Sequence, residues 1–282
     1  MQFALNYSPQ AMALVREKVI DIDLFKCSSD FPAHITDALT LKPVYVHFSL
    51  NAGKPHQKPF DPAAVEAMLK QTSTKLVSVH LGATNEDFPD IPLESANEDH
   101  RKRVLEQLLK DVRVVTKHFG SEQVILENFP YHASARCRPG EKSLEVLRAT
   151  VHPESIAMVV KETGCGLLLD IDHALVTAHY IGQGVKEYIA QLPVQSIREL
   201  HMTGTCDHEG WLESHLPMQN DDWALFDWAL GNIASGTWGH PAIFAFEYGG
   251  TGPAFAWRSN AKVIAEQVPE FRRRISQFAL AS

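Results

Sequence analysis

Short apolar runs rich in β-branched and aromatic residues alternate along the chain with longer segments in which apolar residues recur every three or four positions. The short runs predict strands, and the long segments predict helices with one buried face. Eight such strand–helix units follow one another, which is typical of a parallel sheet with crossover helices. The expected strands span residues 3–7, 22–27, 44–50, 76–81, 123–128, 166–171, 197–202 and 242–248.

The helix expected after the fourth strand has the clearest pattern. Its apolar residues form one stripe at steps of three or four, namely Val104, Leu108, Val112, Val115 and Phe119. Gly120 follows the stripe and predicts the helix end, because glycine readily adopts the backbone conformation of a C-terminal cap. Upstream, Ser95 and Glu98 have the S-x-x-E spacing of a capping box, which predicts the helix start.

Two proline positions add predictions about other helices. Asp61 followed by Pro62 places a carboxylate at an N-cap and proline at the first helical position, so a helix is expected to begin there. The last helical pattern of the chain carries Val263, Ile264, Phe271, Ile275 and Phe278. Pro269 lies within this pattern and predicts an interruption or a second helix start.

The organisation of the chain favours one barrel. Its 282 residues, 45% of them hydrophobic, suffice for one large α/β barrel or two average domains. No linker or change of composition divides the chain, so residues 1–282 are expected to form a single domain. Eight strand–helix units over this length favour an α/β fold of the closed (β/α)8 TIM barrel type. No G-x-G-x-x-G turn follows the first strand, which removes the usual signature of a dinucleotide-binding sheet.

The net charge of −8, from 26 Lys and Arg against 34 Asp and Glu, opposes tight binding to nucleic acid or to an anionic membrane. A small-molecule or peptide substrate is therefore favoured. No apolar run reaches the roughly 20 residues of a spanning helix, and residues 1–9 lack the pattern of a signal peptide. The four cysteines form no C-x-x-C pair and are expected to be reduced thiols, at Cys27, Cys137, Cys165 and Cys206. These features predict a cytoplasmic protein.

Residues of the metal-ligand type end most of the expected strands. In a (β/α)8 barrel the active site lies at the C-terminal ends of the strands, so these positions are the first candidates for chemistry. Six strands end in, or run directly into, such a residue, at His47, His80, Glu127, Asp170, His201 and Glu247. Random scatter of histidines and acids would not respect strand ends.

Two short spacings extend this set. In Asp170-Ile171-Asp172-His173, a turn after the strand can bring His173 back toward a metal bound by Asp170. In Glu213-Ser214-His215, two side chains that are two positions apart on an extended segment share a face and can bind one ion. Nine candidates result: His47, His80, Glu127, Asp170, His173, His201, Glu213, His215 and Glu247.

Nine imidazole and carboxylate ligands exceed the needs of one ion, which predicts two or three divalent or trivalent metal ions with bridging carboxylates. Glu127 is the favoured bridge. The set contains no cysteine, so iron, zinc and manganese all remain open. Of the 14 histidines, a further six lie in expected helices or loops and are assigned to the surface or core, at His34, His56, His100, His118, His152 and His240.

Several positions have competing interpretations. Asp207 and His208 could replace Glu213 and His215 as the ligand pair of the loop. The later pair is preferred because it is flanked by Trp211 and Trp223, which could shield a site from water. Asp172 could be a solvent-facing turn residue. Lys26, at the end of the second strand, could bind an anionic substrate or form a salt bridge with a neighbouring carboxylate.

The order His, His, Glu, Asp-x-x-His, His, acid-x-His, Glu along successive strands resembles the xylose-isomerase-like barrel superfamily, especially endonuclease IV with its trinuclear zinc site. Several stretches are more similar to the multinuclear non-heme iron-dependent oxidative enzymes, the group that includes the iron enzyme of methanobactin biosynthesis. These stretches are V-H-F-S-L at 46–50, L-E-N at 126–128, L-L-D-I-D-H at 168–173, V-T-A-H at 176–179 and H-M-T-G at 201–204.

Three positions depart from the iron group. Asn often stands there in place of His173, Asp in place of Glu213, and Glu in place of Lys26. The first departure leans toward the ligand set of endonuclease IV. The third, Lys26, argues against transferring the substrate of the iron group to this chain.

The resemblance implies a metalloenzyme with a di- or trinuclear site, favouring iron-dependent oxidation of a peptide or small molecule. A second hypothesis is a zinc- or manganese-dependent phosphoesterase, in which the metal lowers the pKa of a bound water. A third is a sugar isomerase or epimerase, which needs fewer of the nine ligands. The non-enzymatic alternative is a metal-stabilised binding protein with a saturated coordination shell.

Overall fold

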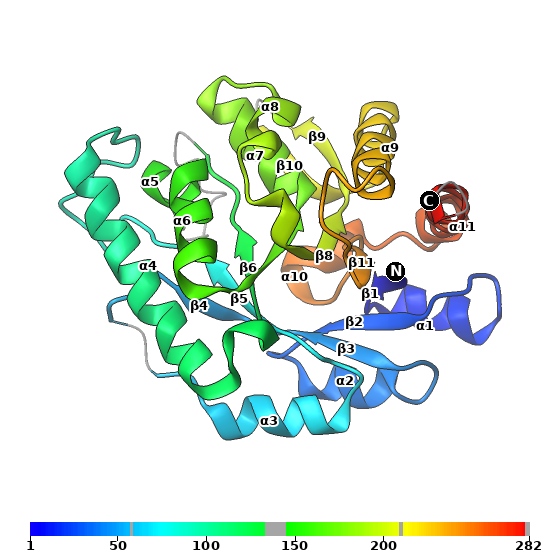
Figure 1. The fold of residues 1–282 in the computed structure, drawn as a ribbon. Helices are drawn as coiled ribbons and strands as arrows, with labels where there is room; N and C mark the ends of the chain where they lie inside the picture. The colour runs from blue at the N-terminus through cyan, green and yellow to red at the C-terminus, as the bar shows by residue number, and fades with distance from the viewer. Residues whose placement is uncertain (57–58, 133–144, 209–210, 280–282) are drawn as a thin grey trace. The chain divides into compact units, whose positions relative to one another are not determined.

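The computed structural model describes residues 1–56, 59–132, 145–208 and 211–279. Strands and helices alternate along the chain (Figure 1), and two compact units are distinguished by their internal contacts. The first unit comprises Met1–Phe48, Ala63–Lys75 and the chain from Ile197 onward. The second comprises Ser49–Pro62 and Leu76–Ser196. That residues 1–282 form a single domain stays a prediction.

The first unit is built on five parallel strands in the order β3-β2-β1-β11-β8. Their bounds are Gln2–Asn6 for β1, Leu24–Ser28 for β2, Val44–His47 for β3, Ile197–Met202 for β8 and Ile243–Phe246 for β11. An antiparallel hairpin of β9 (Gly204–His208) and β10 (Trp211–Leu216) follows β8. The sequence patterns predicted the five strands but not this hairpin.

The helices of this unit are α1 (Pro9–Arg16), α2 (Pro32–Ala38), α3 (Pro62–Gln71), α9 (Asn220–Ala234), α10 (Gly252–Phe255) and α11 (Ala261–Ala279), with a 3-10 turn η3 at Ala256–Arg258. Aromatic rings fill the space between α9, α11 and the sheet. Phe271 of α11 packs against Phe244 and Phe246 of β11 with ring centroids 5.1 and 4.6 Å away, and against Phe226 of α9 at 5.0 Å. These buried rings anchor both helices to the strands that position the site.

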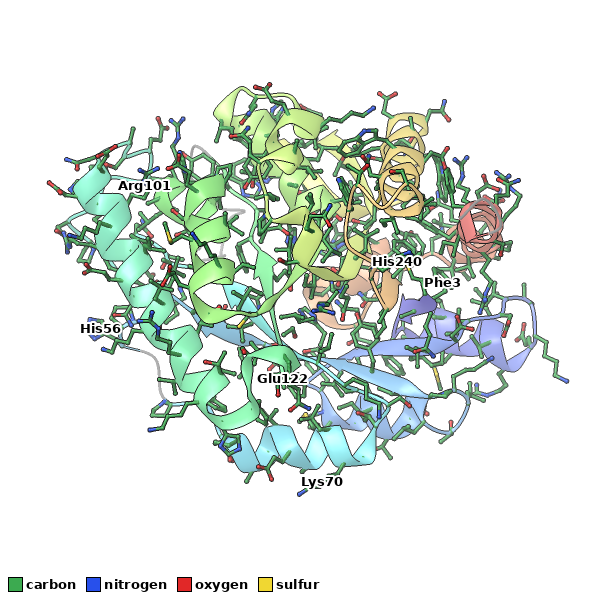
Figure 2. The ribbon with its side chains drawn as sticks, in the orientation of Figure 1. Phe3, His56, Lys70, Arg101, Glu122 and His240 are labelled. Carbon is green, nitrogen blue, oxygen red and sulfur yellow. The ribbon has the colours of Figure 1, made fainter. Side chains whose placement is uncertain are left out.

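The second unit holds four parallel strands in the order β7-β6-β5-β4. They span Leu50–Ala52 for β4, Val77–Leu81 for β5, Val124–Asn128 for β6 and Gly166–Asp170 for β7. Its helices are α4 (Glu98–Phe119), α5 (Arg148–Val151), α6 (Pro153–Thr163), α7 (Ile171–Ile181) and α8 (Val185–Ala190), with 3-10 turns η1 (Ser121–Gln123) and η2 (Val194–Ser196). Helix α4, which carries the labelled Arg101 in Figure 2, packs against α6. Arg101 pairs with Glu154 of α6 at 2.6 Å.

Each of the eight expected strands overlaps a strand of the structure, and most bounds agree within two residues. The expected strand 44–50 is divided into β3 and the start of β4. The stripe of α4 is confirmed, since Val104, Leu108 and Val112 are fully buried and Gly120 ends the helix with a φ of 83°. Helix α3 begins at Pro62, as its proline predicted.

The predicted capping box of α4 is wrong. The N-cap is Asn97, whose side-chain oxygen accepts the N–H of Asp99 at 2.8 Å, so Glu98 is the first helical residue rather than the third. Ser95 instead accepts the N–H of Asn97 at 3.2 Å and contacts His100 Nδ1 at 2.7 Å. The serine thus supports the cap residue from outside the helix.

The predicted interruption at Pro269 is also wrong, because α11 runs through the proline without a break. Proline removes one backbone hydrogen bond within a helix. The residues around it, Ile264, Val268 and Phe271, are at most 1% exposed, so their burial holds the helix together.

Cys27, Cys165 and Cys206 carry free thiols, whereas Cys137 lies outside the described residues. Burial raises the pKa of the Cys27 thiol to about 12. Within the described part of the chain, no helix is both long enough and apolar enough to cross a membrane.

Glu270 on α11 provides a test of local electrostatics. Its carboxylate accepts hydrogen bonds from Arg273 and Arg274, and these bonds lower its pKa from 4.5 to about 2. A lowered folded-state pKa stabilises the fold above pH 4.5, and this stabilisation is lost as the pH falls from 4.5 toward 2. Because the side chain is 30% exposed, solvent screening limits the effect to below about 1 kcal/mol.

We therefore expect Glu270→Gln to be slightly less stable than wild type at pH 7, with the difference shrinking between pH 4.5 and pH 2. Urea unfolding of both proteins along this pH series measures the difference. A gap that stays constant through this range would show that the ion pairs do not set the pKa of Glu270.

Candidate metal centre

Four of the candidate ligands lie together in the first unit, and we call them the first-unit cluster: His47, His201, His215 and Glu247. His47 is the last residue of β3, His201 lies near the end of β8, and Glu247 directly follows β11. The His201 Nδ1 atom lies 2.8 Å from Glu247 Oε1, and the rings of His47 and His201 have centroids 5.4 Å apart. The parallel register of β8 and β11, with His201 opposite Ala245, brings these strand ends together.

Lys26 joins this cluster through an ion pair. Its ammonium contacts Glu247 Oε1, and only 7% of Lys26 and 4% of Glu247 are exposed. Of the two interpretations of Lys26, the salt bridge is the one that the structure contains. A buried charge pair of this kind neutralises part of the acidic charge of the cluster.

The hairpin residues behave differently from the sequence expectation. His215 has a left-handed φ of 60°, and the β9–β10 register shifts between Glu213 and Leu216. The two side chains therefore do not share the face of a regular extended segment. His215 Nδ1 lies 3.7 Å from Glu247 Oε2, whereas Glu213 belongs to none of the groups of three close ligands found among the described residues.

The alternative hairpin pair is only partly described. Asp207 lies opposite Leu212 in the β9–β10 ladder and is exposed, and the side chain of His208 lies outside the described set. Shielding of the site by Trp211 and Trp223 stays a prediction, and the structure shows what Trp223 contacts in the first unit. It packs on Phe271 of α11 with ring centroids 4.5 Å apart, because α9 turns this face toward α11.

The second unit holds the second-unit cluster: His80, Glu127, Asp170 and His173. One donor atom from each of Glu127, Asp170 and His173 lies within 4.8 Å of the others, and these residues are 1%, 0% and 8% exposed. His173 Nδ1 is 3.6 Å from Glu127 Oε1 and 3.5 Å from Asp170 Oδ2. His80 Nε2 lies 3.1 Å from the other oxygen of Glu127.

The immediate passage from β7 into α7 places Asp170 and His173. Asp170 ends the strand and is the N-cap of α7, with Oδ1 accepting the His173 N–H at 2.8 Å. The first turn of α7 is thus the turn that brings His173 back to Asp170. Asp172 is 1% exposed within α7, so its interpretation as a solvent-facing turn residue is wrong.

Backbone carbonyls set the orientation of both imidazoles in this cluster. His80 Nδ1 lies 3.2 Å from the Leu50 oxygen, and His173 Nδ1 lies 2.9 Å from the Asn128 oxygen. A carbonyl can only accept a hydrogen bond, so the neutral His173 ring carries its proton on Nδ1 and keeps the lone pair of Nε2. The His80 ring has an acceptor at each nitrogen, the Leu50 carbonyl at Nδ1 and Glu127 at Nε2, and these two contacts fix its orientation. Histidine ligands of metals are commonly fixed in this way by their second nitrogen.

The donor chemistry of both clusters fits a transition metal. Burying several carboxylates within a few ångströms is costly unless cations or hydrogen bonds compensate their charge. The donors are carboxylate oxygens and imidazole nitrogens without thiolates, which suits iron, zinc and manganese. Sequence reasoning missed Glu199 and Tyr45, which contact His201, although an acid two positions before His201 in an apolar strand was a usable signal.

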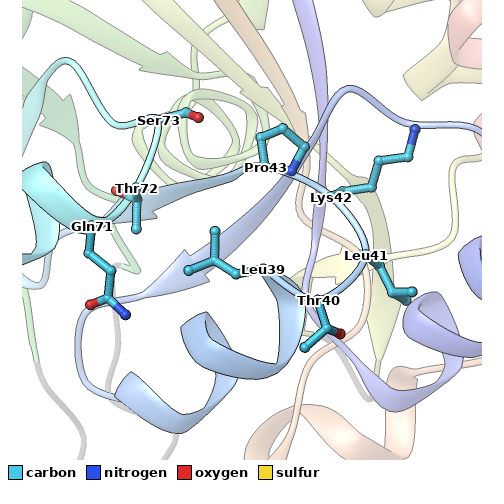
Figure 3. Close-up of a pocket in the computed structure, with 8 residues that line it drawn as sticks. All are labelled: Leu39, Thr40, Leu41, Lys42, Pro43, Gln71, Thr72 and Ser73. Carbon is cyan, nitrogen blue, oxygen red and sulfur yellow. The ribbon is translucent and has the colours of Figure 1, made fainter.

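A pocket in the first unit lies away from the candidate metal ligands. It has a volume of about 500 Å³ and opens between the segment before β3 and the segment after α3 (Figure 3). Its lining consists of Leu39, Thr40, Leu41, Lys42, Pro43, Gln71, Thr72 and Ser73. This is the N-terminal end of β3, where barrels of this class place stability rather than catalysis.

Comparison with solved structures identifies the class of fold. A D-psicose 3-epimerase structure has a TM-score of 0.55 at 11% identity, covering all of both chains. A xylose isomerase domain protein from Alicyclobacillus acidocaldarius has a TM-score of 0.54 at 15% sequence identity, and the match covers 99% of both chains. A sugar phosphate isomerase/epimerase from Parabacteroides distasonis has a TM-score of 0.52 at 13% sequence identity, and the match covers 98% of this chain and 95% of the other. The chain has the predicted α/β TIM-barrel fold of the xylose isomerase-like class.

The family follows from the sequence match. Residues 26–237 match the family model described as RiPP precursor modification enzyme MbnB/TglH/ChrH, where a RiPP is a ribosomally synthesised and post-translationally modified peptide. This match covers most of the chain, which therefore belongs to that family and confirms the resemblance stated from the motifs.

Curated relatives agree with this assignment. A UPF0276 protein of Rhizobium meliloti is 29% identical over 175 residues, which cover 58% of this chain and 52% of the relative. A UPF0276 protein of a Caulobacter species is 33% identical over 73 residues, which cover 24% of this chain and 26% of the relative. The matches thus span between a quarter and about half of the relatives' length.

Proposed function

We propose that the chain is an iron-dependent oxidative enzyme that modifies a ribosomally made precursor peptide. The observation that carries the proposal is the buried group of Glu127, Asp170 and His173, whose donor atoms converge within 4.8 Å. The family description supports a peptide as the substrate class. A carboxylate-rich ligand set with imidazoles suits iron, which can change its valence.

We propose further that the centre holds two or three ions. Each cluster alone supplies at least three imidazole or carboxylate side chains, which meets the needs of one ion. The proposed ligands are the nine predicted residues, His47, His80, Glu127, Asp170, His173, His201, Glu213, His215 and Glu247. Glu213 is the weakest member, because the bulge in β10 separates its direction from that of His215.

When bound, iron would supply one-electron redox chemistry and the activation of dioxygen. The chain's own residues hold the proposed ligands in place and orient them. The carbonyl of Asn128 keeps Nε2 of His173 available, and the carbonyl of Leu50 orients the His80 ring. The cap interaction of Asp170 fixes the start of α7. The Lys26 ammonium balances the charge of Glu247 in the first-unit cluster.

The wider context of the proposal rests on two observations. The family match at residues 26–237 runs through both units, which supports residues 1–282 acting as one catalytic domain. The free thiols of Cys27, Cys165 and Cys206 support a reducing, cytoplasmic location. The likeness to sugar isomerases concerns the fold alone and gives the isomerase hypothesis no separate support.

Metal content tests the proposal directly. We expect the protein, purified without oxygen and reconstituted with iron, to bind at least two equivalents of metal, because two clusters each supply a ligand set. Elemental analysis after removal of free metal measures the ratio. His118→Ala is the matched control, since this histidine lies on α4 against Phe60 and Phe119, and its metal content should equal that of wild type. At most one equivalent after reconstitution would contradict the multinuclear centre and favour the isomerase hypothesis.

A further inference from the structure

The ring of His201 is held on its far side by two buried residues that are not among the candidate ligands. Glu199 Oε1 lies 2.6 Å from His201 Nε2, and the Tyr45 hydroxyl lies 3.1 Å from the same nitrogen. Glu199 and Tyr45 are each 2% exposed, and His201 is fully buried. The other ring nitrogen, Nδ1, points to Glu247 at 2.8 Å.

The fold of the first unit explains how these side chains meet. Glu199 and His201 are two positions apart on β8, so they lie on the same face of the strand. Tyr45 comes from β3, at the other end of the five-strand order. Its ring packs with two small residues of intervening strands, Ala4 of β1 and Ala245 of β11, which leave room for it to reach His201.

The contacts on the two sides of the ring favour one tautomer of the imidazole. Carboxylate oxygens lie near both ring nitrogens, with Glu199 Oε1 2.6 Å from Nε2 and Glu247 Oε1 2.8 Å from Nδ1. Glu247 Oε1 already accepts from the Lys26 ammonium, so the shorter contact to Glu199 favours the proton on His201 Nε2. A neutral imidazole with that proton has its lone pair on Nδ1. In that tautomer the Nδ1 lone pair faces Glu247 Oε1, and a cation bound between the two atoms would compensate their negative charge.

We propose that Glu199, assisted by the hydroxyl of Tyr45, is a positioning residue that locks His201 with its proton on Nε2 and reserves Nδ1 for a metal ion. This inference rests on the proposed metal centre and adds residues that act only through His201. The arrangement is opposite to that of His173, where a backbone carbonyl holds Nδ1 and leaves Nε2 available. A carboxylate behind a ligand histidine also raises the basicity of the coordinating nitrogen.

A graded set of substitutions tests the inference with Zn²⁺ as a probe that needs no turnover. Glu199→Met keeps the approximate volume but removes the acceptor, and we expect the affinity for Zn²⁺ to fall about 10- to 100-fold. The Zn²⁺ affinity of Glu199→Gln should lie between those of Glu199→Met and wild type, because the amide oxygen of glutamine can accept the Nε2–H but carries no full charge. The Zn²⁺ affinity of Tyr45→Phe should fall by less than about tenfold, because this variant keeps Glu199. Competition with a chromophoric chelator gives each affinity.

Arg198→Met is the matched control, because Arg198 is an exposed neighbour on the same strand and its replacement should leave the Zn²⁺ affinity unchanged. A second measurement, the nitrogen-15 chemical shifts of the His201 imidazole, uses wild-type protein without metal. The signals are assigned by comparison with His201→Gln, and we expect them to show the proton on Nε2. Because this measurement needs no Glu199 variant, it decides the question even if Glu199→Met does not fold.

Two results would overturn the inference: a His201 ring protonated on Nδ1, or Zn²⁺ affinities of the Met and Gln variants equal to that of wild type. Both are distinct from failure of the proposed function, in which wild-type protein itself binds no metal. A loss of thermal stability in Glu199→Met at unchanged Zn²⁺ affinity would assign Glu199 to packing alone.

Discussion

Asp170→Asn is expected to bind metal at least tenfold more weakly than wild type while its metal-free form keeps wild-type stability or exceeds it. Asparagine caps a helix as well as aspartate does, so the bond from the His173 N–H is retained. The substitution also removes a charge from a fully buried position beside Glu127, which relieves repulsion between two buried carboxylates. What it removes is the anionic ligand.

Asp170→Ala separates the two roles of this residue. It should lose metal as the asparagine variant does and in addition lose about 0.5–2 kcal/mol of metal-free stability, because the first turn of α7 is left uncapped. Chelator competition and urea unfolding of metal-free protein measure the two effects. Asn97→Ala is the matched control, since it removes the exposed cap of α4 and should lower stability without changing metal binding. Equal metal affinities in wild type and Asp170→Asn would remove Asp170 from the ligand set.

Local features of the sequence were sufficient to locate most of the strands and their polar ends. Apolar runs depend on burial on both faces of a parallel strand, so their ends are visible without knowledge of the partners. His47 ends β3 and Asp170 ends β7, while Glu247 directly follows β11, as the patterns predicted. The structure brings His201 and Glu247 together, and likewise Glu127, Asp170 and His173, whereas their role as ligands stays a prediction.

Features that depend on distant parts of the chain could not be predicted in this way. The partner of Lys26 is Glu247, more than 200 positions later in the sequence, and only the pairing of β1 with β2 and β11 brings them close. The continuity of α11 through Pro269 depends on rings contributed by β11 and α9. In both cases the structure depends on contacts between distant segments, which the local sequence does not show.

The hairpin shows a different limit. An extended segment was assumed for Glu213-Ser214-His215, and the alternation of side chains followed from it. The backbone of His215 is left-handed instead, and its N–H donates to Thr203 Oγ1 at 2.9 Å. This hydrogen bond joins β10 to the residue directly before β9, and His215 Nδ1 lies 3.7 Å from Glu247 without Glu213 taking part. Non-glycine residues in this conformation are uncommon, so a pattern-based prediction does not include them.

The choice between oxidation and hydrolysis depends on the metal, because the same carboxylates and imidazoles can serve both. We expect protein loaded anaerobically with iron to consume dioxygen and to change its visible absorption, and the zinc form to be inert toward dioxygen. An oxygen electrode and absorption spectra, recorded after free iron is removed, measure both effects. Asp170→Asn treated identically is the control for residual free iron, and its oxygen consumption should fall together with its metal content.

The phosphoesterase hypothesis predicts the reverse result from the same preparations. A zinc or manganese form would hydrolyse simple phosphodiesters, with a rate that rises as a metal-bound water ionises near neutral pH. The net charge of −8 disfavours a nucleic-acid substrate, so tight binding to abasic-site DNA at physiological salt is not expected. Iron-loaded protein that leaves dioxygen unchanged, beside a zinc form that cleaves phosphodiesters, would replace the oxidative proposal with a hydrolase. Oxygen consumption that depends on Asp170 and increases on adding a precursor peptide would instead join the family assignment to the chemistry of these ligands.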